Sequence, residues 1–508
     1  MENRFLSLIP DNTMPLQEKL EKYAECNVYP FHMPGHKRQD MGLEEPWRID
    51  ITELEGFDNL NHAEGILKEE QAHMARVFGA DSSFYLVNGS TVGVITAIFA
   101  AVPRGGKILV SRNCHKSAYN AILLRELEAV YLYPRETESG LQGNIAPQDV
   151  EVALEMQPDI NAVLVTSPTF DGVVSDIASI SEIAHAHGIP LIVDEAHGAH
   201  LGFSEHFPQK ALACGADLVI ESTHKTLPSY TQTAALHVKG NRVSRDVVQK
   251  YLSIFQTTSP SYILMTGLSH CTRVMETQGK ELMDQLYERL MKFYENTKDL
   301  KCLKVLQPED TKNDPSVWKR DISKIIVFCG KAGITGQELF DRLAHEYAIQ
   351  MEMAAGEYVN AICSPYDTQE GFDRLEEALK EMDREYASGD RQEITMEQKD
   401  EIRRLYLPRE KRMKIYEAEE SYKKTIPLKE ADAKVSAEFV YLYPPGIPFL
   451  VPGEVIPEGF GETVMKLRDG GYSIQGLQDM SSETIRIIHE EREQAEAESA
   501  APGEMALQ

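Results

Sequence analysis

Residues 191–226, LIVDEAHGAHLGFSEHFPQKALACGADLVIESTHKT, decide the fold, because they hold two short apolar runs that each lead to an ionisable side chain. The first run ends at Asp194, and the second leads to Lys225, 31 residues further on. Nearly continuous apolar runs with a helix-length segment between them are typical of neighbouring strands in a parallel sheet that is buried on both faces. Open α/β sheets bind ligands at the carboxyl ends of their strands. The stretch therefore predicts a site at that edge of a sheet.

The same pattern extends in both directions from this stretch. From residue 84 onward, short β-rich runs alternate with helical segments. This alternation predicts an α/β fold whose large domain holds a mostly parallel seven-stranded sheet covered by helices. The predicted strands are FYLVN, KILVS, AVYLYP, AVLVTSPT, LIVDEA, LVIES and AALHV.

The rest of the chain divides into further parts. Residues 241–300 read as long helices of the kind that link two domains, and strands and helices alternate again beyond them. The polar run SGDRQEITMEQ marks a break, and the acidic, Ala-rich end predicts a disordered tail. We expect an N-terminal segment (1–55), a large domain (56–305), a small α+β domain (306–390) and a C-terminal domain with that tail (391–508).

The net charge narrows the class of ligand. Lys and Arg total 52 against 80 Asp and Glu, which gives a formal net charge of -28. This excess of acid argues against binding to the phosphate backbone of a nucleic acid and suits cationic small molecules. The alternative is that the acidic charge only maintains solubility.

The cysteines and the start of the chain indicate the compartment. Seven cysteines are scattered without C-x-x-C spacing, which favours reduced thiols over a zinc site, so we expect no metal. The start lacks a basic region followed by an apolar core, and no run is long enough to cross a bilayer. We expect a cytoplasmic protein with no membrane or nucleic-acid partner.

A candidate phosphate site lies at Asn88-Gly89-Ser90-Thr91, between the strand FYLV and the helical run VGVITAIFAAV. The first amides of a helix lack internal partners and its dipole favours negative charge, so a phosphate can bind there. The hydroxyls of Ser90 and Thr91 can add donors. The alternative is that these residues only cap the helix.

Asp194 and Lys225 supply complementary chemistry. A buried carboxylate needs a partner, and a protonated pyridine nitrogen is one, while a cap or a metal site with Glu195 and His197 is the alternative for Asp194. A desolvated lysine near other cations has a lowered pKa, so Lys225 can form an imine with an aldehyde. Without the other motifs, Lys225 would be read as an ordinary surface lysine. The phosphate site, the pyridinium partner and the imine-forming lysine together predict a pyridoxal-5′-phosphate (PLP) enzyme.

The chain resembles the Orn/Lys/Arg decarboxylases, PLP-dependent enzymes of the aspartate aminotransferase fold (fold type I). The resemblance covers nearly the whole chain, from FHMPGHKR through NGST, SRNCHKS, SPTFDG, DEAHGAH, STHKTLPSYTQTAALH and TTSPSY to YLYPPGIPFLVPGE. Because FHMPGHKR begins at residue 31, the chain looks like the short form without an N-terminal wing domain. Tyr230, after Lys225, is a bulky departure that would alter the pocket.

The resemblance assigns roles to residues of this chain. His115 would stack on one face of the pyridine ring and Ala196 would pack on the other, while Asp194 would pair with the ring nitrogen. His115 would otherwise be a satisfied core histidine. Lys225, His115 and Asp194 would be the catalytic residues. The phosphate would be held by Ser90, Thr91, Ser222 and His224. Gly89 and His197 would also contact the cofactor.

The resemblance also implies an assembly and an activity. Thr258 would reach the phosphate from the neighbouring subunit of a homodimer or dimer-based oligomer; a helix cap is its alternative role. The activity would be decarboxylation of a basic L-amino acid, arginine to agmatine first, then lysine to cadaverine or ornithine to putrescine, in polyamine synthesis or acid resistance. Glu454 would bind the basic side chain, unless it has only a turn role. The alternatives are an aminotransferase or aldolase on the same fold, or a non-catalytic PLP-binding regulator.

Overall fold

We examined a computed structural model, which describes residues 14–388, 405–442, 446–469 and 472–489. The described residues form two compact units. The first comprises those within Met1–Pro103, Ile108–Arg112 and Tyr131–Thr395, and the second those within Arg104–Lys107, Asn113–Val130 and Met396–Gln508. The four-part division expected from the sequence stays a prediction, and the predicted tail and most of the polar break lie outside the described residues.

A seven-stranded sheet with the order β2-β9-β8-β7-β5-β3-β4 is the central element. Strands β5, β7 and β8 are parallel, whereas β9 runs antiparallel to β2 and to β8. Each of the seven predicted runs forms one strand, so the predicted fold class is confirmed. The strands are β2 (Ser82–Leu86), β3 (Lys107–Ser111), β4 (Glu128–Leu132), β5 (Ile160–Thr166), β7 (Leu191–Asp194), β8 (Leu218–Glu221) and β9 (Ala234–Val238).

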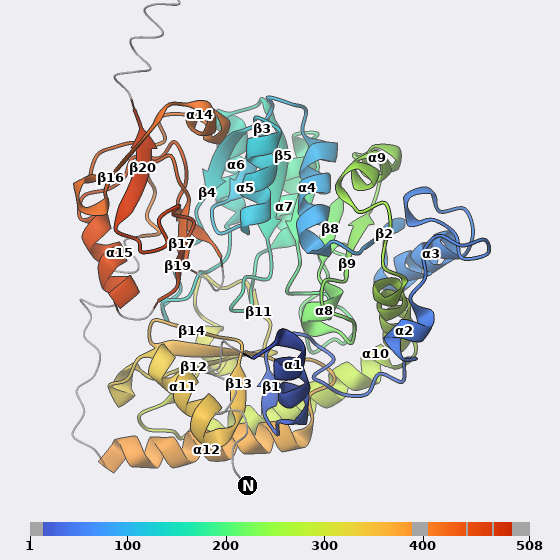
Figure 1. Ribbon diagram of the computed structural model, residues 1–508, viewed down its shortest axis with the longest axis vertical. Helices are drawn as coiled ribbons and strands as arrows, with labels where there is room; N and C mark the ends of the chain where they lie inside the picture. The colour runs from blue at the N-terminus through green and yellow to red at the C-terminus, as the bar shows by residue number, and fades with distance from the viewer. Residues whose placement is uncertain (1–13, 389–404, 443–445, 470–471, 490–508) are drawn as a thin grey trace, which may run out of the picture. The chain divides into compact units, whose positions relative to one another are not determined.

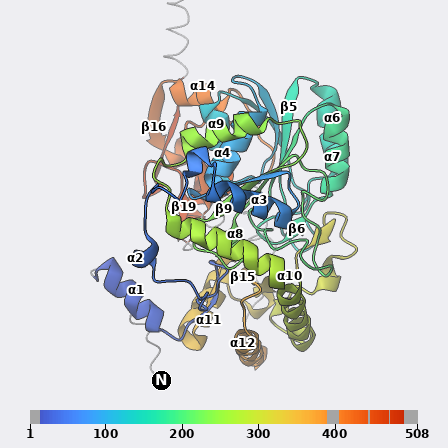
Figure 2. The ribbon, with the colours of Figure 1, turned by 90° about the vertical axis from the view of Figure 1, so that its right-hand side faces the viewer.

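Helices cover both faces of this sheet (Figures 1 and 2). On one face, α4 (Gly89–Ala101) packs against the strands and against α9 (Arg245–Phe255). At Gly93, an added Cβ would lie 2.7 Å from Leu86 and 2.9 Å from Ile220, so only glycine allows this close contact of helix and sheet. On the other face lie α6 (Pro147–Met156) and α7 (Ile177–Ala186).

One long helix, α10 (Tyr262–Thr297), follows α9 and confirms the helical stretch predicted after the sheet. Its apolar side, including Leu268, Leu286 and Phe293, belongs to the largest core cluster of the first unit. It packs against α3 (Ile66–Phe78) and α12 (Gln369–Ser388). The shorter N-terminal helices are α1 (Leu16–Glu25) and α2 (Pro46–Ile49).

A smaller antiparallel sheet with the order β10-β12-β15-β14 completes the first unit. The N-terminal strand β1 (Tyr29–Phe31) pairs in parallel with β13 (Ile349–Met351), so the start of the chain lies beside this sheet (Figure 1). The pair β6–β11 is antiparallel. The remaining elements are β6 (Val173–Val174), α8 (Thr223–Thr226), β10 (Lys304–Val305), β11 (Lys319–Arg320), β12 (Lys324–Phe328), α11 (Gly336–Tyr347), β14 (Met353–Ala355) and β15 (Tyr358–Ile362).

The second unit has its own apolar core, which includes Leu428, Phe449, Leu450, Phe460 and Ile485. Its strands form a pair, β16–β20, and a three-stranded sheet, β18-β17-β19. Its elements are α5 (Lys116–Leu124), α14 (Ile415–Glu420), β16 (Lys423–Pro427), β17 (Val440–Leu442), β18 (Pro448–Leu450), α15 (Phe460–Asp469), β19 (Ile474–Gln475) and β20 (Thr484–Ile488).

None of the helices in the described part of the chain combines the length and the apolar character that a membrane span requires.

Candidate active site

Lys225 lies in the short helix α8, directly after strand β8, at the strand end that the sequence predicted. It is partly exposed, and its Nζ lies 2.9 Å from Nε2 of His197. The ring of Phe170 stands edge-on to His197, with 4.9 Å between the ring centroids, and so fixes one side of that imidazole. The lysine amine is therefore partly buried and held by a neighbouring ring.

Asp194 is the last residue of the neighbouring strand β7 and is buried. Its Oδ1 accepts a hydrogen bond from the amide of Ala196, at 3.2 Å. Burial raises the pKa of this carboxyl, while the charge of Lys225 and the Ala196 amide oppose the rise. A buried carboxyl with one hydrogen bond retains acceptor capacity for a cationic partner.

The electrostatic surroundings of Lys225 come from three segments that are distant in sequence. Burial lowers the pKa of the Lys225 amine, the carboxylates of Asp194 and Glu352 oppose this, and the cation of Lys324 adds to it. Burial also raises the pKa of Glu352, whose Oε2 accepts from the amide of Met33 at 2.8 Å. A lowered pKa leaves more of the amine neutral and nucleophilic at ordinary pH.

Ser222, three residues before Lys225, has a buried hydroxyl without a hydrogen-bond partner in the described residues. Ser222 is fully buried, and its Oγ finds no hydrogen-bond partner within the described residues. Nδ1 of His224 donates to the carbonyl of Thr233, 2.7 Å away, and burial lowers the pKa of His224 to about 4. An unsatisfied buried hydroxyl costs free energy, so its place is explained if a ligand supplies the partner.

The Gly89-Ser90-Thr91 segment forms the first turn of α4, and its N-cap residue, Asn88, makes no side-chain cap bond. Ser90 and Thr91 are thus not the cap. Gly89 has φ +78°, in the left-handed region that favours glycine. A Cβ added at Gly89 would lie 4.0 Å from the Gln232 carbonyl oxygen. The turn therefore lies close to residues 232–233, and the carbonyl of Thr233 contacts His224.

Three other predicted site residues are described by their local contacts alone. His115 is the N-cap of α5 in the second unit, where Nδ1 accepts from the Ser117 amide at 3.2 Å. Glu454, also in the second unit, is buried, and its Oε2 accepts from the Val451 amide at 2.9 Å. Thr258 is exposed and is not a cap, because Ser261 caps α10. Their assigned roles stay predictions.

The alternative of a metal site around Asp194 is not supported by the geometry. Glu195 accepts from the Ala211 amide at 3.0 Å and interacts electrostatically with Glu221 and Lys210. Across the described ranges, His, Cys, Asp and Glu side chains nowhere gather in a group suited to an ion.

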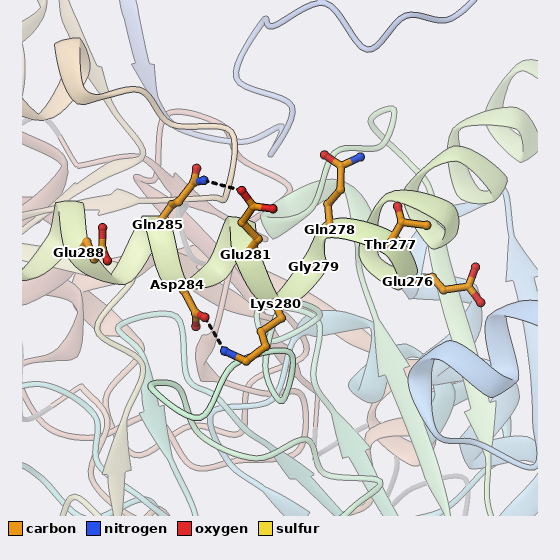
Figure 3. A pocket seen from close by; sticks show the side chains of 9 residues that line it. All are labelled: Glu276, Thr277, Gln278, Gly279, Lys280, Glu281, Asp284, Gln285 and Glu288. Carbon is orange, nitrogen blue, oxygen red and sulfur yellow. Dashed lines mark hydrogen bonds and ion pairs between the residues drawn. The ribbon is translucent and has the colours of Figure 1, made fainter.

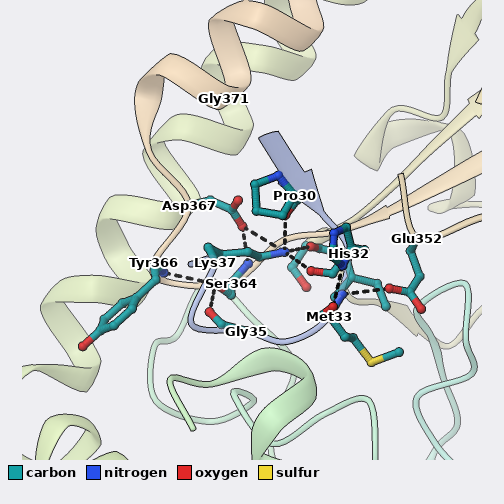
Figure 4. A network of polar contacts seen from close by, with 12 residues as sticks. Pro30, His32, Met33, Gly35, Lys37, Glu352, Ser364, Tyr366, Asp367 and Gly371 are labelled. Carbon is teal, nitrogen blue, oxygen red and sulfur yellow. Dashed lines mark hydrogen bonds and ion pairs between the residues drawn. The ribbon is translucent and has the colours of Figure 1, made fainter. Parts of the chain in front are cut away.

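The N-terminal strap, residues 30–38, contacts the Lys225 turn and was not assigned to the site from the sequence. Figure 4 shows the polar contacts that its residues make. The amide of Gly35 donates to the His224 carbonyl at 2.7 Å, and an added Cβ would lie 2.6 Å from the Leu227 carbonyl oxygen. The fully buried Lys37 donates to the carbonyls of Pro30 and His32, at 3.1 and 3.0 Å. The strap therefore fixes the backbone of the lysine turn.

A surface hollow on α10, lined by residues 276–281, 284, 285 and 288, is a less suitable site (Figure 3). Its acidic side chains are partly paired: Lys280 with Asp284 at 2.5 Å, and Gln285 with Glu281 at 3.2 Å. It offers paired charges on one helix and no nucleophile beside a base. The Lys225 edge is the stronger candidate.

The residues of the first unit fit pyridoxal phosphate. Lys225 has a lowered pKa, a buried carboxyl with spare acceptor capacity ends the neighbouring strand, and the unpaired Ser222 hydroxyl lies three residues before the lysine. The uncapped first turn of α4 adds backbone amides for a phosphate.

Comparisons with known proteins agree with this arrangement. The family described as Orn/Lys/Arg decarboxylase, major domain, matches residues 14–326, and its C-terminal domain matches residues 397–467. The arginine decarboxylase of Bacillus subtilis (strain 168) is 33% identical, over 94% of this chain and 98% of the relative.

Two solved structures share the fold. Lysine decarboxylase A from Pseudomonas aeruginosa has a TM-score of 0.73 at 20% identity, and the match covers 96% of this chain and 80% of that chain. A structure of SPT with its PLP internal aldimine has a TM-score of 0.54 at 13% identity, over 71% of this chain and 87% of that chain.

Proposed function

Because the chain belongs to the Orn/Lys/Arg decarboxylase family, we propose that it removes the α-carboxylate of a basic L-amino acid, arginine first and lysine or ornithine next. The observation that carries the proposal is Lys225, partly buried at a strand end, with its amine 2.9 Å from His197 and under the charge of the buried Asp194. Arginine comes first because relatives that match over almost their full length are named arginine decarboxylase.

The cofactor in this proposal is pyridoxal phosphate, which supplies an electron sink for the carbon that loses carbon dioxide. Lys225 would hold its aldehyde and Asp194 its ring nitrogen. The phosphate would bind at the Ser222 hydroxyl and at the first turn of α4, with Gly89, Ser90 and Thr91. His224, Ala196 and His197 would complete the pocket.

The chain's own groups then divide the remaining work. A buried Asp194 carboxylate favours a positive charge beside it, because in a low dielectric opposite charges attract strongly. His197 lies within hydrogen-bond distance of Lys225 Nζ and can exchange a proton with the amine. The first-unit residues also shield this edge from bulk water, since Asp194 and Ser222 are buried.

The basic side chain of the substrate needs an anionic partner. Glu352 belongs to the same unit as Lys225 and acts electrostatically on its amine, so we propose it as a partner beside the earlier candidate, Glu454. Glu454 already accepts the amide of Val451, and it has Lys411 as a charged neighbour. Within the described residues, Glu352 accepts the Met33 amide through Oε2, which leaves Oε1 for the substrate.

Two further parts of the proposal concern the assembly and the compartment. We propose a homodimer or dimer-based oligomer in which Thr258 of one subunit reaches the phosphate of the other, because Thr258 is exposed. We also propose a cytoplasmic location, since all seven cysteines have free thiols.

The test is carbon dioxide release from L-arginine, L-lysine and L-ornithine by the protein loaded with pyridoxal phosphate. We expect release from arginine to exceed release from the other two, and Lys225→Ala to reduce it by about 10³-fold or more. Glu352→Gln should raise KM for arginine more than it lowers kcat, because it removes a binding charge.

The contrary results are also defined. Covalent cofactor on Lys225 without carbon dioxide from any of the three amino acids would overturn decarboxylation and favour transamination or aldol cleavage. A Glu352→Gln variant with unchanged KM would return the side-chain role to Glu454.

A further inference from the structure

A second buried lysine lies close to the site and has no role in the proposed reaction. Lys324 begins strand β12 and is fully buried. Its Nζ lies 2.8 Å from Oδ2 of Asp321, also fully buried, and 3.2 Å from the hydroxyl of Ser323. A buried ion pair seldom adds net stability, so its presence calls for a further explanation.

The same turn holds the loop that carries His197. Lys324 Nζ donates to the His197 carbonyl at 3.3 Å. Three residues further on, His200 Nε2 lies 3.2 Å from Asp321 Oδ2 and 3.2 Å from Ser323 Oγ. The backbone at one end of this loop and the side chain at the other are therefore both fixed by residues 321–324. We call this set the 321–324 clamp.

The clamp is itself rigidly held. The Asp321 amide donates to the Gly172 carbonyl at 2.8 Å, and the Cys363 amide donates to the Ser323 carbonyl at 2.9 Å. At Gly172, φ is +92° and an added Cβ would lie 2.7 Å from the Asp321 carbonyl oxygen. Burial alone would raise the pKa of Asp321, but Lys324 and His200 lower it well below its usual range, so the carboxylate stays ionised.

From these contacts we infer that Lys324 is a positioning residue for the cofactor lysine: through the His197 carbonyl it holds the His197 ring against Lys225 Nζ. The chain of contacts runs from Asp321 to Lys324 at 2.8 Å, to the His197 carbonyl at 3.3 Å, and from the His197 ring to Lys225 at 2.9 Å. The inference rests on the proposed function only in taking Lys225 as the residue that binds the cofactor.

A direct effect of the Lys324 charge on Lys225 is the competing explanation, and a double-mutant cycle separates the two. The readout is the rate at which the protein, freed of cofactor, forms a covalent adduct with pyridoxal phosphate on Lys225, trapped with borohydride and located by mass spectrometry. We expect Lys324→Met to slow adduct formation by about tenfold, and by less than about twofold when His197 is already alanine. Lys324→Arg should restore most of the rate.

The controls keep the outcome interpretable. Lys210→Met removes another buried lysine, which pairs with Glu221 at 3.8 Å, and should leave the rate within about twofold. If Lys324→Met does not fold, His200→Asn weakens the clamp without leaving an unpaired charge and should show the same dependence on His197.

Equal slowing by Lys324→Met with and without the His197 ring would overturn the inference and leave a direct charge effect or general destabilisation. An unchanged rate in Lys324→Met would overturn it too. Wild-type protein that forms no adduct on Lys225 would instead overturn the proposed cofactor site, so the two failures are distinguishable.

Discussion

Two Asp–Lys pairs lie in the same unit and have opposite characters. Asp321 and Lys324 are fully buried, 2.8 Å apart, and surrounded by hydrogen bonds. Asp194 and Lys225 act on each other only through their charges, and Lys225 is partly exposed. The pKa of Asp194 is raised by burial, whereas that of Asp321 is held well below its usual range by its partners. We call Asp321–Lys324 the satisfied pair and Asp194–Lys225 the unsatisfied pair. The satisfied pair is suited to hold the backbone, and the unsatisfied pair is suited to bind a ligand.

The largest effect should come from breaking the satisfied pair. Lys324→Met leaves the buried Asp321 carboxylate without its lysine partner, which should lower the free energy of unfolding by about 3–5 kcal/mol. The double variant Asp321→Asn/Lys324→Met removes both charges and should recover much of that loss. Denaturant titration of the cofactor-free protein measures both, and a single variant as stable as wild type would remove the contrast between the pairs.

The next effect concerns the reactivity of Lys225. Because its pKa is lowered by burial, the amine should lose its proton at a lower pH than an ordinary lysine. The neutral fraction of the amine therefore rises earlier on the pH scale, so adduct formation with pyridoxal phosphate should reach its plateau at a lower pH than for an ordinary lysine. A pH–rate profile that follows the ordinary lysine pKa would contradict the unsatisfied character of this pair.

A smaller effect should appear at Asp194. Its folded pKa is raised by burial, so between the ordinary aspartate pKa and that raised value the folded protein keeps a proton that the unfolded chain has lost. Stability should thus fall as pH rises through this window. Asp194→Asn should remove the fall and stabilise the cofactor-free protein at neutral pH by about 1 kcal/mol. Urea unfolding at acid and neutral pH checks the sign, and equal destabilisation at both would contradict it.

The smallest effect should distinguish two buried serines. Ser222 Oγ has no partner in the described residues, so Ser222→Ala should not lower the stability of the cofactor-free protein and should weaken pyridoxal phosphate binding. Ser323 Oγ bonds Lys324 and His200, so Ser323→Ala should cost about 1 kcal/mol. Thermal melting with and without cofactor compares them; matching stability losses would show that Ser222 has a structural partner.

Much of the fold was accessible from local sequence. The seven strands were predicted because each is a short apolar run, and Asp194 and Lys225 were found because they interrupt that pattern at strand ends. Strand order and the antiparallel direction of β9 could not be predicted from local sequence, because they depend on pairings between distant segments.

The supporting residues of the site were missed for the same reason. Lys324 opens an apolar run and reads as the start of a strand, and nothing local reveals that its amine reaches the His197 carbonyl. Glu352 is one of many acidic residues in sequence, and only the fold brings it to Lys225. Gly35 lay in a motif noticed from the sequence, but its contact with the lysine turn is tertiary.

The most direct test of the central claim is the location of the cofactor among the lysines of this chain. The protein is incubated with pyridoxal phosphate, reduced with borohydride, digested and mapped by mass spectrometry. The account predicts one label, on the peptide that contains Lys225, and none on Lys324. A label on Lys324 or another lysine with Lys225 unmodified, or no label at all, would contradict it.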